Sequence, residues 1–118
     1  MTVTLYRPVG TAELMLIEAS GWRAFPPRLP EQPIFYPVTN EAYARQIARD
    51  WNAQHNDDKR GFVTRFQVRE HVAARYERQI VGAREHEELW VPAKELDDFN
   101  AAIVGQIEVI AAYPEQET

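Results

Sequence analysis

The chain has 118 residues, the length of one domain, and its 45 % hydrophobic and 26 % charged residues are typical of an ordered globular protein. The absence of cysteine excludes a disulfide scaffold, a thiolate zinc site and a cysteine nucleophile, and fits a reducing compartment, so we expect a cytoplasmic protein. The net charge of −5 argues against bulk nucleic-acid binding. Neither a signal peptide nor a membrane-spanning run is expected from the pattern of apolar residues.

The first elements are a strand and a helix. Alternating apolar and polar residues predict a strand over residues 2–9, which Gly10 closes. Thr11 is the expected N-cap of a helix over residues 12–20, and Gly21 is its expected C-terminal stop. A proline-rich loop follows.

A second strand and helix come next, over residues 34–38 and 41–52, and Thr39 and Asn40 are the expected capping residues. The large apolar side chains of this helix recur every fourth residue, which predicts one buried stripe: Tyr43, Ile47 and Trp51, with Ala44 and Ala48 beside them.

The C-terminal half is rich in strands. Strand patterns cover residues 61–68, 78–83, 88–92 and 106–113, and short helical patterns cover residues 70–76 and 93–100. This order of elements predicts an α+β fold. We expect residues 1–113 to form a single domain and residues 114–118 to be a tail.

Several common kinds of active site are excluded. His86 and Glu87 begin like a zinc-protease helix, but Trp90 stands where the second histidine would be, so no metal site is expected. The glycines are too scattered for a phosphate-binding loop, and Ser20, the only serine, is expected at a helix terminus.

A dispersed set of polar and aromatic residues remains as the candidate site. A carboxylate at the start of a strand, such as Glu87 or Glu88, can stabilise the positive charge that develops when an N-glycosidic bond breaks. An arginine such as Arg7 can hold a diphosphate, and rings such as Tyr6 and Tyr36 can stack on a base. Trp90 alternates with Leu89 and is assigned to the core rather than to stacking.

The order of four segments resembles a known family. "LYR" at the end of the first strand, "SGW" after the helix, "FYPVTNEAYARQIA" and "EELWVP" are similar to the sequence blocks of the arginine-class mono-ADP-ribosyltransferases, the cholera-toxin-like group. The chain also resembles short bacterial proteins that carry an "ADP-ribosylation" label. The resemblance implies one ADP-ribosyltransferase-like α+β domain, with a mixed or antiparallel split sheet and two to three short helices.

The resemblance also implies roles for individual residues. Glu88 takes the catalytic position, Arg7 holds NAD with Tyr6 and Tyr36, and Thr39 either supports the site or only caps the helix. His86 stands where many members carry the acceptor-orienting Glu or Gln, and Glu87 lies beside it. A register shifted by one residue would make Glu87 the key carboxylate instead, and the two registers exclude each other because they face opposite sides of the strand.

Three functions stay open at this point. The first is an enzyme that cleaves the nicotinamide N-glycosidic bond of NAD, its substrate, and transfers ADP-ribose to a protein acceptor or to water. The second is a catalytically inactive domain of the same fold that binds a nucleotide or another protein. The third is a structural domain without a small-molecule site. Replacement of the acceptor-orienting residue by His86 favours altered or lost acceptor chemistry.

Overall fold

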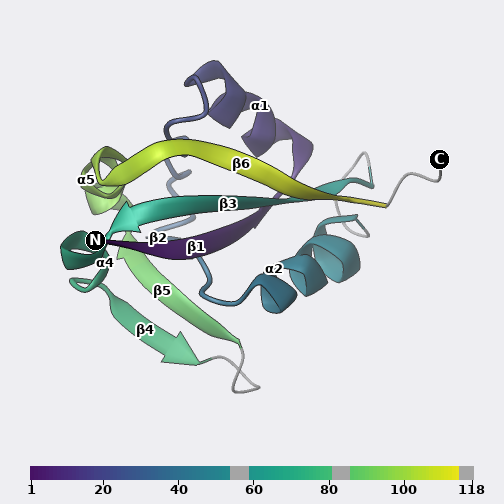
Figure 1. Ribbon diagram of the computed structural model, residues 1–118. Helices are drawn as coiled ribbons and strands as arrows, with labels where there is room; N and C mark the ends of the chain where they lie inside the picture. Colours follow the sequence, from purple (N-terminus) through teal and green to yellow (C-terminus); the bar gives the residue numbers. More distant parts are fainter. Residues whose placement is uncertain (54–58, 81–85, 115–118) are drawn as a thin grey trace.

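The computed structural model describes residues 1–53, 59–80 and 86–114, and it confirms the α+β class (Figure 1). The predicted order of strands and helices is confirmed as well. The elements are β1 (Thr2–Val9), α1 (Thr11–Ala19), β2 (Ile34–Phe35), α2 (Glu41–Ile47), the π-helical turn η1 (Ala48–Asn52), β3 (Gly61–Arg69), α4 (Glu70–Ala73), β4 (Glu77–Ile80), β5 (Glu87–Pro92), the 3₁₀ turn η2 (Ala93–Glu95), α5 (Leu96–Ala101) and β6 (Ile103–Tyr113). The predicted strand over residues 78–83 and the predicted tail extend outside the described residues.

The strands form two small antiparallel sheets, ordered β1-β3-β6 and β2-β5-β4. Val38 connects them, because it forms a bridge with Tyr6 of β1 and another with Glu88 of β5. The amide of Tyr6 donates to the Val38 carbonyl at 2.9 Å, and the Val38 amide donates back at 2.8 Å. The expected split sheet is therefore present, and this bridge brings the ends of β1 and β5 close together.

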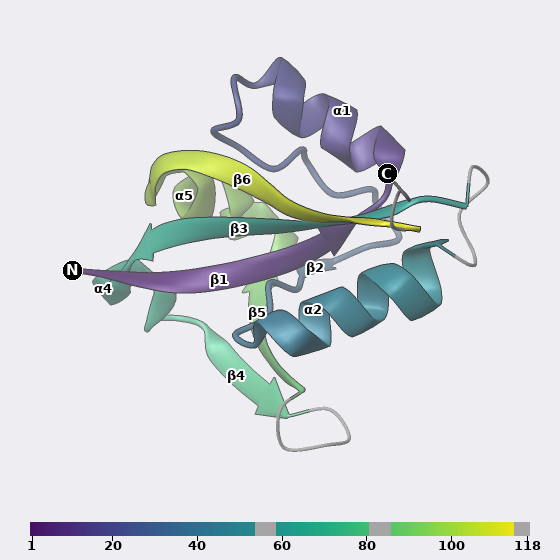
Figure 2. The same ribbon diagram turned by 45° about the vertical axis from the view of Figure 1, so that its right-hand side comes forward.

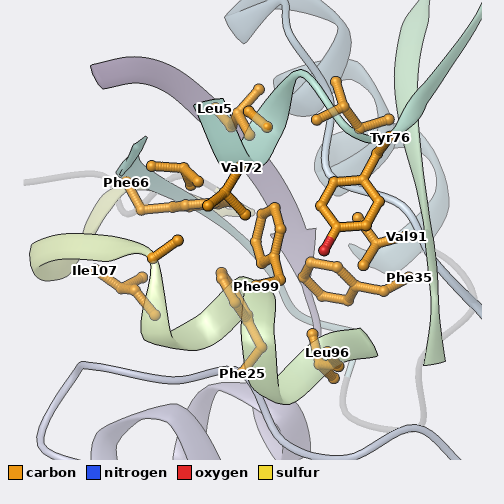
Figure 3. Packing of buried hydrophobic residues seen from close by; sticks show 14 of the residues in the cluster. Leu5, Phe25, Phe35, Phe66, Val72, Tyr76, Val91, Leu96, Phe99 and Ile107 are labelled. Atoms are coloured by element: carbon orange, nitrogen blue, oxygen red, sulfur yellow. The ribbon is translucent and has the colours of Figure 1, made fainter. Parts of the chain in front are cut away.

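The main core lies between the two sheets and α5, and it is dominated by aromatic rings (Figure 3). Phe99 is fully buried, and its ring contacts those of Phe35, Phe66 and Tyr76, with centroids 5.6–6.2 Å apart. Phe25, which follows α1, packs on Phe35 and Phe66 at 5.0 and 4.8 Å. Tilted and edge-on contacts of this kind add to the hydrophobic gain from burial. The core thereby fixes the loop after α1 against α5.

A second, smaller cluster lies where α2 packs beside β1 and β3 (Figure 2). Ala44 and Ala48 are fully buried there, and their small side chains let the helix approach the sheet closely. Gly61, the first residue of β3, completes this contact. A Cβ at Gly61 would lie 2.4 Å from the Ala48 carbonyl oxygen and 2.7 Å from the Cβ of Asn52, so only glycine fits.

The start of α1 differs from the sequence prediction by one residue, whereas α2 starts at Glu41 as predicted. Gly10, not Thr11, is the N-cap of α1, and its extended backbone presents its carbonyl to the Leu14 amide at 3.0 Å. Asn40 alone caps α2, because its Oδ1 accepts from the Tyr43 amide at 3.0 Å. The assignment of Thr39 to capping is therefore wrong.

The predicted stop of α1 at Gly21 is confirmed. Gly21 has a φ of +78°, a left-handed conformation that glycine adopts without strain. Its amide donates to the Glu18 carbonyl, and the Trp22 amide donates to the Ile17 carbonyl. This is the Schellman arrangement, which satisfies carbonyls that the end of a helix leaves open. None of the helices in the described ranges has the length and apolarity that crossing a bilayer requires.

Candidate functional site

A cavity of about 430 Å³ opens between α2 and the strands that meet at Val38. Its volume is in the range of pockets that take small ligands. Four segments line it: the end of β1, the residues after β2, the α2–η1 segment and β5. The described lining residues are Arg7, Pro8, Tyr36, Val38, Ile47, Trp51, Asn52, Glu88 and Trp90. Three predicted site residues, Arg7, Tyr36 and Glu88, therefore share one cavity although 81 positions separate the first from the last.

Glu88 faces this cavity because of the alternation along β5. Leu89 and Val91 are fully buried in the core, so Glu88 and Trp90 point to the other side of the strand. The Glu88 carboxylate accepts hydrogen bonds from the Tyr43 hydroxyl at 2.9 Å and from Trp90 Nε1 at 3.3 Å. Trp90 is thus half-buried at the cavity wall, and its assignment to the core is wrong.

Tyr43 is the residue of α2 that holds Glu88. Burial first, and then the hydrogen bond to Glu88 and repulsion from its charge, raise the pKa of Tyr43 to about 12. The phenol therefore stays protonated and donates throughout the neutral range. His86 stacks on the Tyr43 ring with centroids 4.1 Å apart and an interplanar angle of 13°. His86 therefore lies beside the residues that hold Glu88, but it is not among the described residues that line the cavity.

Glu87 points away from the cavity and has partners of its own. Its Oε1 accepts from the Thr39 hydroxyl at 3.0 Å and from Arg78 Nη1 at 3.2 Å. The Thr39 amide also donates to the Glu87 carbonyl at 3.1 Å. Thr39 consequently ties the segment after β2 to β5. Of the two registers, the one with Glu88 is the one that points a carboxylate into the cavity.

Arg7 is nearly buried and already paired with a carboxylate of α1. Its Nε and Nη2 donate to the two oxygens of Glu13 at 2.6 and 3.0 Å, and the two side chains are only 11 % and 20 % exposed. The guanidinium carbon also lies 4.6 Å from the centre of the Phe35 ring. The Nη1 edge is consequently the edge of Arg7 that a ligand in the cavity could use.

A second guanidinium, that of Arg28, lies near this ion pair. Burial lowers the pKa of Arg28, repulsion from Arg7 lowers it further, and Glu13 and Tyr36 act in the opposite direction. Within the described residues, its buried Nε finds no acceptor. Arg7 is ion-paired with Glu13, and Arg28 is a second cation near this pair, so the three side chains together carry one positive charge.

The α2–η1 segment presents Ile47 and Trp51 to the cavity, whereas Tyr43 packs against the second cluster. Ala44 and Ala48 are the fully buried residues, whereas Ile47 lines the cavity and Trp51 is 61 % exposed at its rim. The predicted buried stripe is therefore confirmed for Ala44 and Ala48 and wrong for Trp51, while Tyr43 and Ile47 are half-buried. The close approach of Gly61 leaves room only for small side chains toward the sheet, so the large ones turn outward.

The remaining predicted residue, Tyr6, lies elsewhere. Its side chain packs with Tyr43 against the second cluster and is not among the described residues that line the cavity. Tyr36, by contrast, is 37 % exposed and contacts Trp90 edge-on, with ring centroids 5.7 Å apart. The cavity wall therefore has three exposed or half-buried rings, those of Tyr36, Trp51 and Trp90.

Sequence reasoning missed Glu13, Arg28 and Asn52. Glu13 was visible as a first-turn acid of α1, but no local pattern showed that it would bind Arg7.

In the described ranges, no three His, Asp or Glu side chains gather in a way that could hold a metal ion.

Protein-family models, curated proteins and solved structures were each compared with this chain, and none of the three comparisons found a match. The residues of the cavity themselves are therefore the basis for assigning a function. These are a carboxylate held by two donors, a buried arginine across the cavity, and three aromatic rings between and around them.

Proposed function

We propose that this cavity binds NAD or a related nucleotide, and that the chain is an ADP-ribosyltransferase-like enzyme that acts on the nicotinamide N-glycosidic bond. The observation that carries the proposal is the presence of Glu88 and Arg7 in the wall of one cavity with Tyr36, Trp51 and Trp90. A carboxylate, a cation and aromatic rings are the groups that recognise a sugar, a phosphate and a base.

Glu88 would act on the ribose next to nicotinamide. As the bond between ribose C1′ and the nicotinamide nitrogen breaks, nicotinamide leaves with the bonding electron pair and positive charge develops on the sugar. A carboxylate held in place stabilises this charge without having to reorganise. The donors Tyr43 and Trp90 fix its orientation. A nucleophile, either water or an acceptor side chain, then attacks C1′ and loses its proton.

Arg7 would hold the diphosphate. Because Nε and Nη2 bind Glu13, a phosphate would use Nη1 or displace Glu13 from part of the guanidinium. Arg28 adds positive charge close by. A protein acceptor and a cytoplasmic location remain part of the proposal, and both follow from the resemblance and the composition rather than from the cavity.

A second candidate function is an inactive domain of the same kind that binds a nucleotide without cleaving it. The specific observation in its favour is that Arg7 is engaged by Glu13, and that the acceptor-orienting position, His86, stacks on Tyr43. In this form the cavity would recognise the nucleotide and perform no bond cleavage.

One experiment separates these functions. We would measure the midpoint of thermal unfolding at millimolar NAD, and nicotinamide release over hours, for the wild type, Glu88→Gln and Glu87→Gln. The enzyme predicts stabilisation by NAD and release that Glu88→Gln abolishes and Glu87→Gln retains. Stabilisation without release would favour the inactive module. An unchanged midpoint together with no release would overturn both, and release lost only in Glu87→Gln would refute the choice of carboxylate.

A further inference from the structure

Helix α1 presents apolar side chains on two opposite faces. Its inner face packs against the main core, where Ile17 is fully buried and Leu14 is half-buried. Its outer face carries four exposed apolar residues at helical spacing, which we call the α1 stripe: Ala12, Met15, Leu16 and Ala19. Met15 is 65 % exposed and Leu16 is 56 % exposed. A helix that is apolar all round is normally buried, so this outer face is expected to have a partner.

The α1 stripe is accessible and lies outside the cavity. α1 forms the upper boundary of the molecule in both ribbon views (Figures 1 and 2). At 3.6 residues per turn, the stripe points away from Leu14 and Ile17 and therefore away from the core. It contains no charged residue, and it shares no residue with the described lining of the cavity. The stripe is thus a surface separate from the site of the proposed function.

The sequence of α1 is nearly the same in both directions about the point between Met15 and Leu16. When residues 12–19, "AELMLIEA", are reversed, alanine matches alanine, glutamate matches glutamate, and each large apolar residue matches another. A two-fold dimer brings one surface patch against its own copy and therefore needs a self-complementary patch. In an antiparallel pair of α1 helices, Met15 would oppose Leu16 of the second copy, and Ala12 would oppose Ala19.

The charges beside the stripe favour the same antiparallel arrangement. Glu18 lies in the last turn of α1, where the helix dipole disfavours an acid and no basic residue of that turn offsets it. An antiparallel second copy would place the positive N-terminal end of its α1 beside Glu18. A parallel copy would instead bring the two Glu18 side chains to the same level. Glu13, the other acid of the helix, is already paired with Arg7.

We infer that the α1 stripe is a dimer interface, in which α1 packs antiparallel on α1 of a second copy of this chain. A standard interface takes about 800 Å² from each partner, roughly one ninth of the 7183 Å² surface of this chain. One face of a nine-residue helix, about 13 Å long, supplies less than this, so the dimer is weak and its population depends on concentration. We expect a Kd of about 100 µM, so that the monomer prevails at low micromolar concentration.

Sedimentation equilibrium from about 5 to about 500 µM measures this association, and the average mass of the wild type is expected to rise from that of one chain towards that of two. Leu16→Glu is expected to raise the Kd at least about tenfold, because it puts an unpaired charge in the middle of the interface. Val104→Glu is the matched control. Val104 is 43 % exposed and pairs with Gln67, which points away from the core face of β3, so this variant should keep the Kd within about twofold. Circular dichroism at about 5 µM checks that both variants are folded.

Cross-linking reports the orientation of the two helices, since the chain has no cysteine of its own. A short bismaleimide is expected to join Ala12→Cys to Ala19→Cys in an equal mixture several-fold more efficiently than it joins either variant to itself. In the antiparallel pair, two copies of the same position are about 10 Å apart along the helix axis.

Four outcomes would overturn the inference. The first is a wild type that keeps the mass of one chain at the highest concentration, because another protein would then have to cover the stripe. The second is a dimer that Leu16→Glu leaves intact or that Val104→Glu dissociates equally. The others are a mass beyond two chains, and cross-linking of Ala12→Cys to itself in preference to the mixture.

Discussion

The ion pair between Arg7 and Glu13 is expected to stabilise the fold, but it also occupies the arginine that would bind an anion. The substitution Glu13→Gln tests both effects. Glutamine keeps the shape of the side chain and one acceptor oxygen but removes the charge. The bonds that it weakens are 2.6 and 3.0 Å long, between side chains that are 11 % and 20 % exposed. We therefore expect the protein to become less stable and Arg7 to become more available to an anion.

The magnitude follows from burial and distance. Two unit charges about 4 Å apart attract by about 4 kcal/mol at an effective dielectric constant of about 20. Desolvation of both groups offsets a large part of this attraction, and hydrogen bonds to charged groups contribute about 1.5–3 kcal/mol net. We expect Glu13→Gln to lower the free energy of unfolding by about 2 kcal/mol, which corresponds to a fall of roughly 6–10 °C in Tm for a domain of this size.

Urea unfolding followed by circular dichroism measures the loss of stability, and a double-mutant cycle with Arg7→Met isolates the coupling. Glu18→Gln, an exposed position on the same helix, is the matched control and should change stability by less than about 0.5 kcal/mol. ADP should bind Glu13→Gln several-fold more tightly than the wild type, because one Arg7 donor loses its acceptor and the negative charge that competes with a phosphate is removed. If Arg7→Met lowers the free energy of unfolding by the same amount in the wild type and in Glu13→Gln, the ion pair does not stabilise the fold. If ADP affinity falls in Glu13→Gln, Arg7 is not the group that holds the phosphate.

Three further outcomes are expected. Because the pKa of Tyr43 is raised, the stabilisation that the protonated Tyr43 provides is complete below pH 10 and is lost as the pH rises from about 10 to 12. Glu88→Gln should lower this pKa toward 10 in a ¹³C-tyrosine NMR titration, and an unchanged titration would refute the hydrogen bond between Tyr43 and Glu88. Gly61→Ala should destabilise the fold by about 1–3 kcal/mol, since its Cβ would lie 2.4 Å from a carbonyl oxygen of η1; a wild-type Tm would show that this contact is looser than the structure has it. Phe99→Ala should cost about 3–5 kcal/mol in urea unfolding, whereas the same truncation at the exposed Leu16 should cost less than about 0.5 kcal/mol, and comparable losses would contradict the position of the core.

Much of the fold could be predicted from the sequence because its signals are local. The alternation of residues 2–9 and of 61–68, and the stop at Gly21, each depend on neighbours within a few positions and on the geometry of a strand or a helix end. The same alternation separated Glu88 from Glu87, since adjacent residues of a strand face opposite sides. The sequence did not show which of these two faces would line the cavity, because that depends on where the second sheet packs.

The sequence of the second helix, by contrast, allowed either of two neighbouring rows of apolar side chains to be the buried one. Tyr43, Ile47 and Trp51 form one row, and Ala44 and Ala48 form the row beside it. Hydrophobicity favours burial of the large row, but the sheet approaches too closely at Gly61 for large side chains to fit. Steric exclusion between segments distant in the sequence therefore decided the face, and it left Ile47 and Trp51 in the cavity wall.

By itself, the sequence determined the α+β order of elements, the absence of cysteine chemistry and the carboxylate at the start of β5, because these depend on composition and on short periodicities. Only the tertiary structure decided that Val38 joins the two sheets, that Glu13 holds Arg7, and that Trp51 and Asn52 line the same cavity as Glu88. Each of these contacts joins segments that no local pattern relates. They are set by the packing of two sheets and a helix against each other, where the shape of each surface selects its partner.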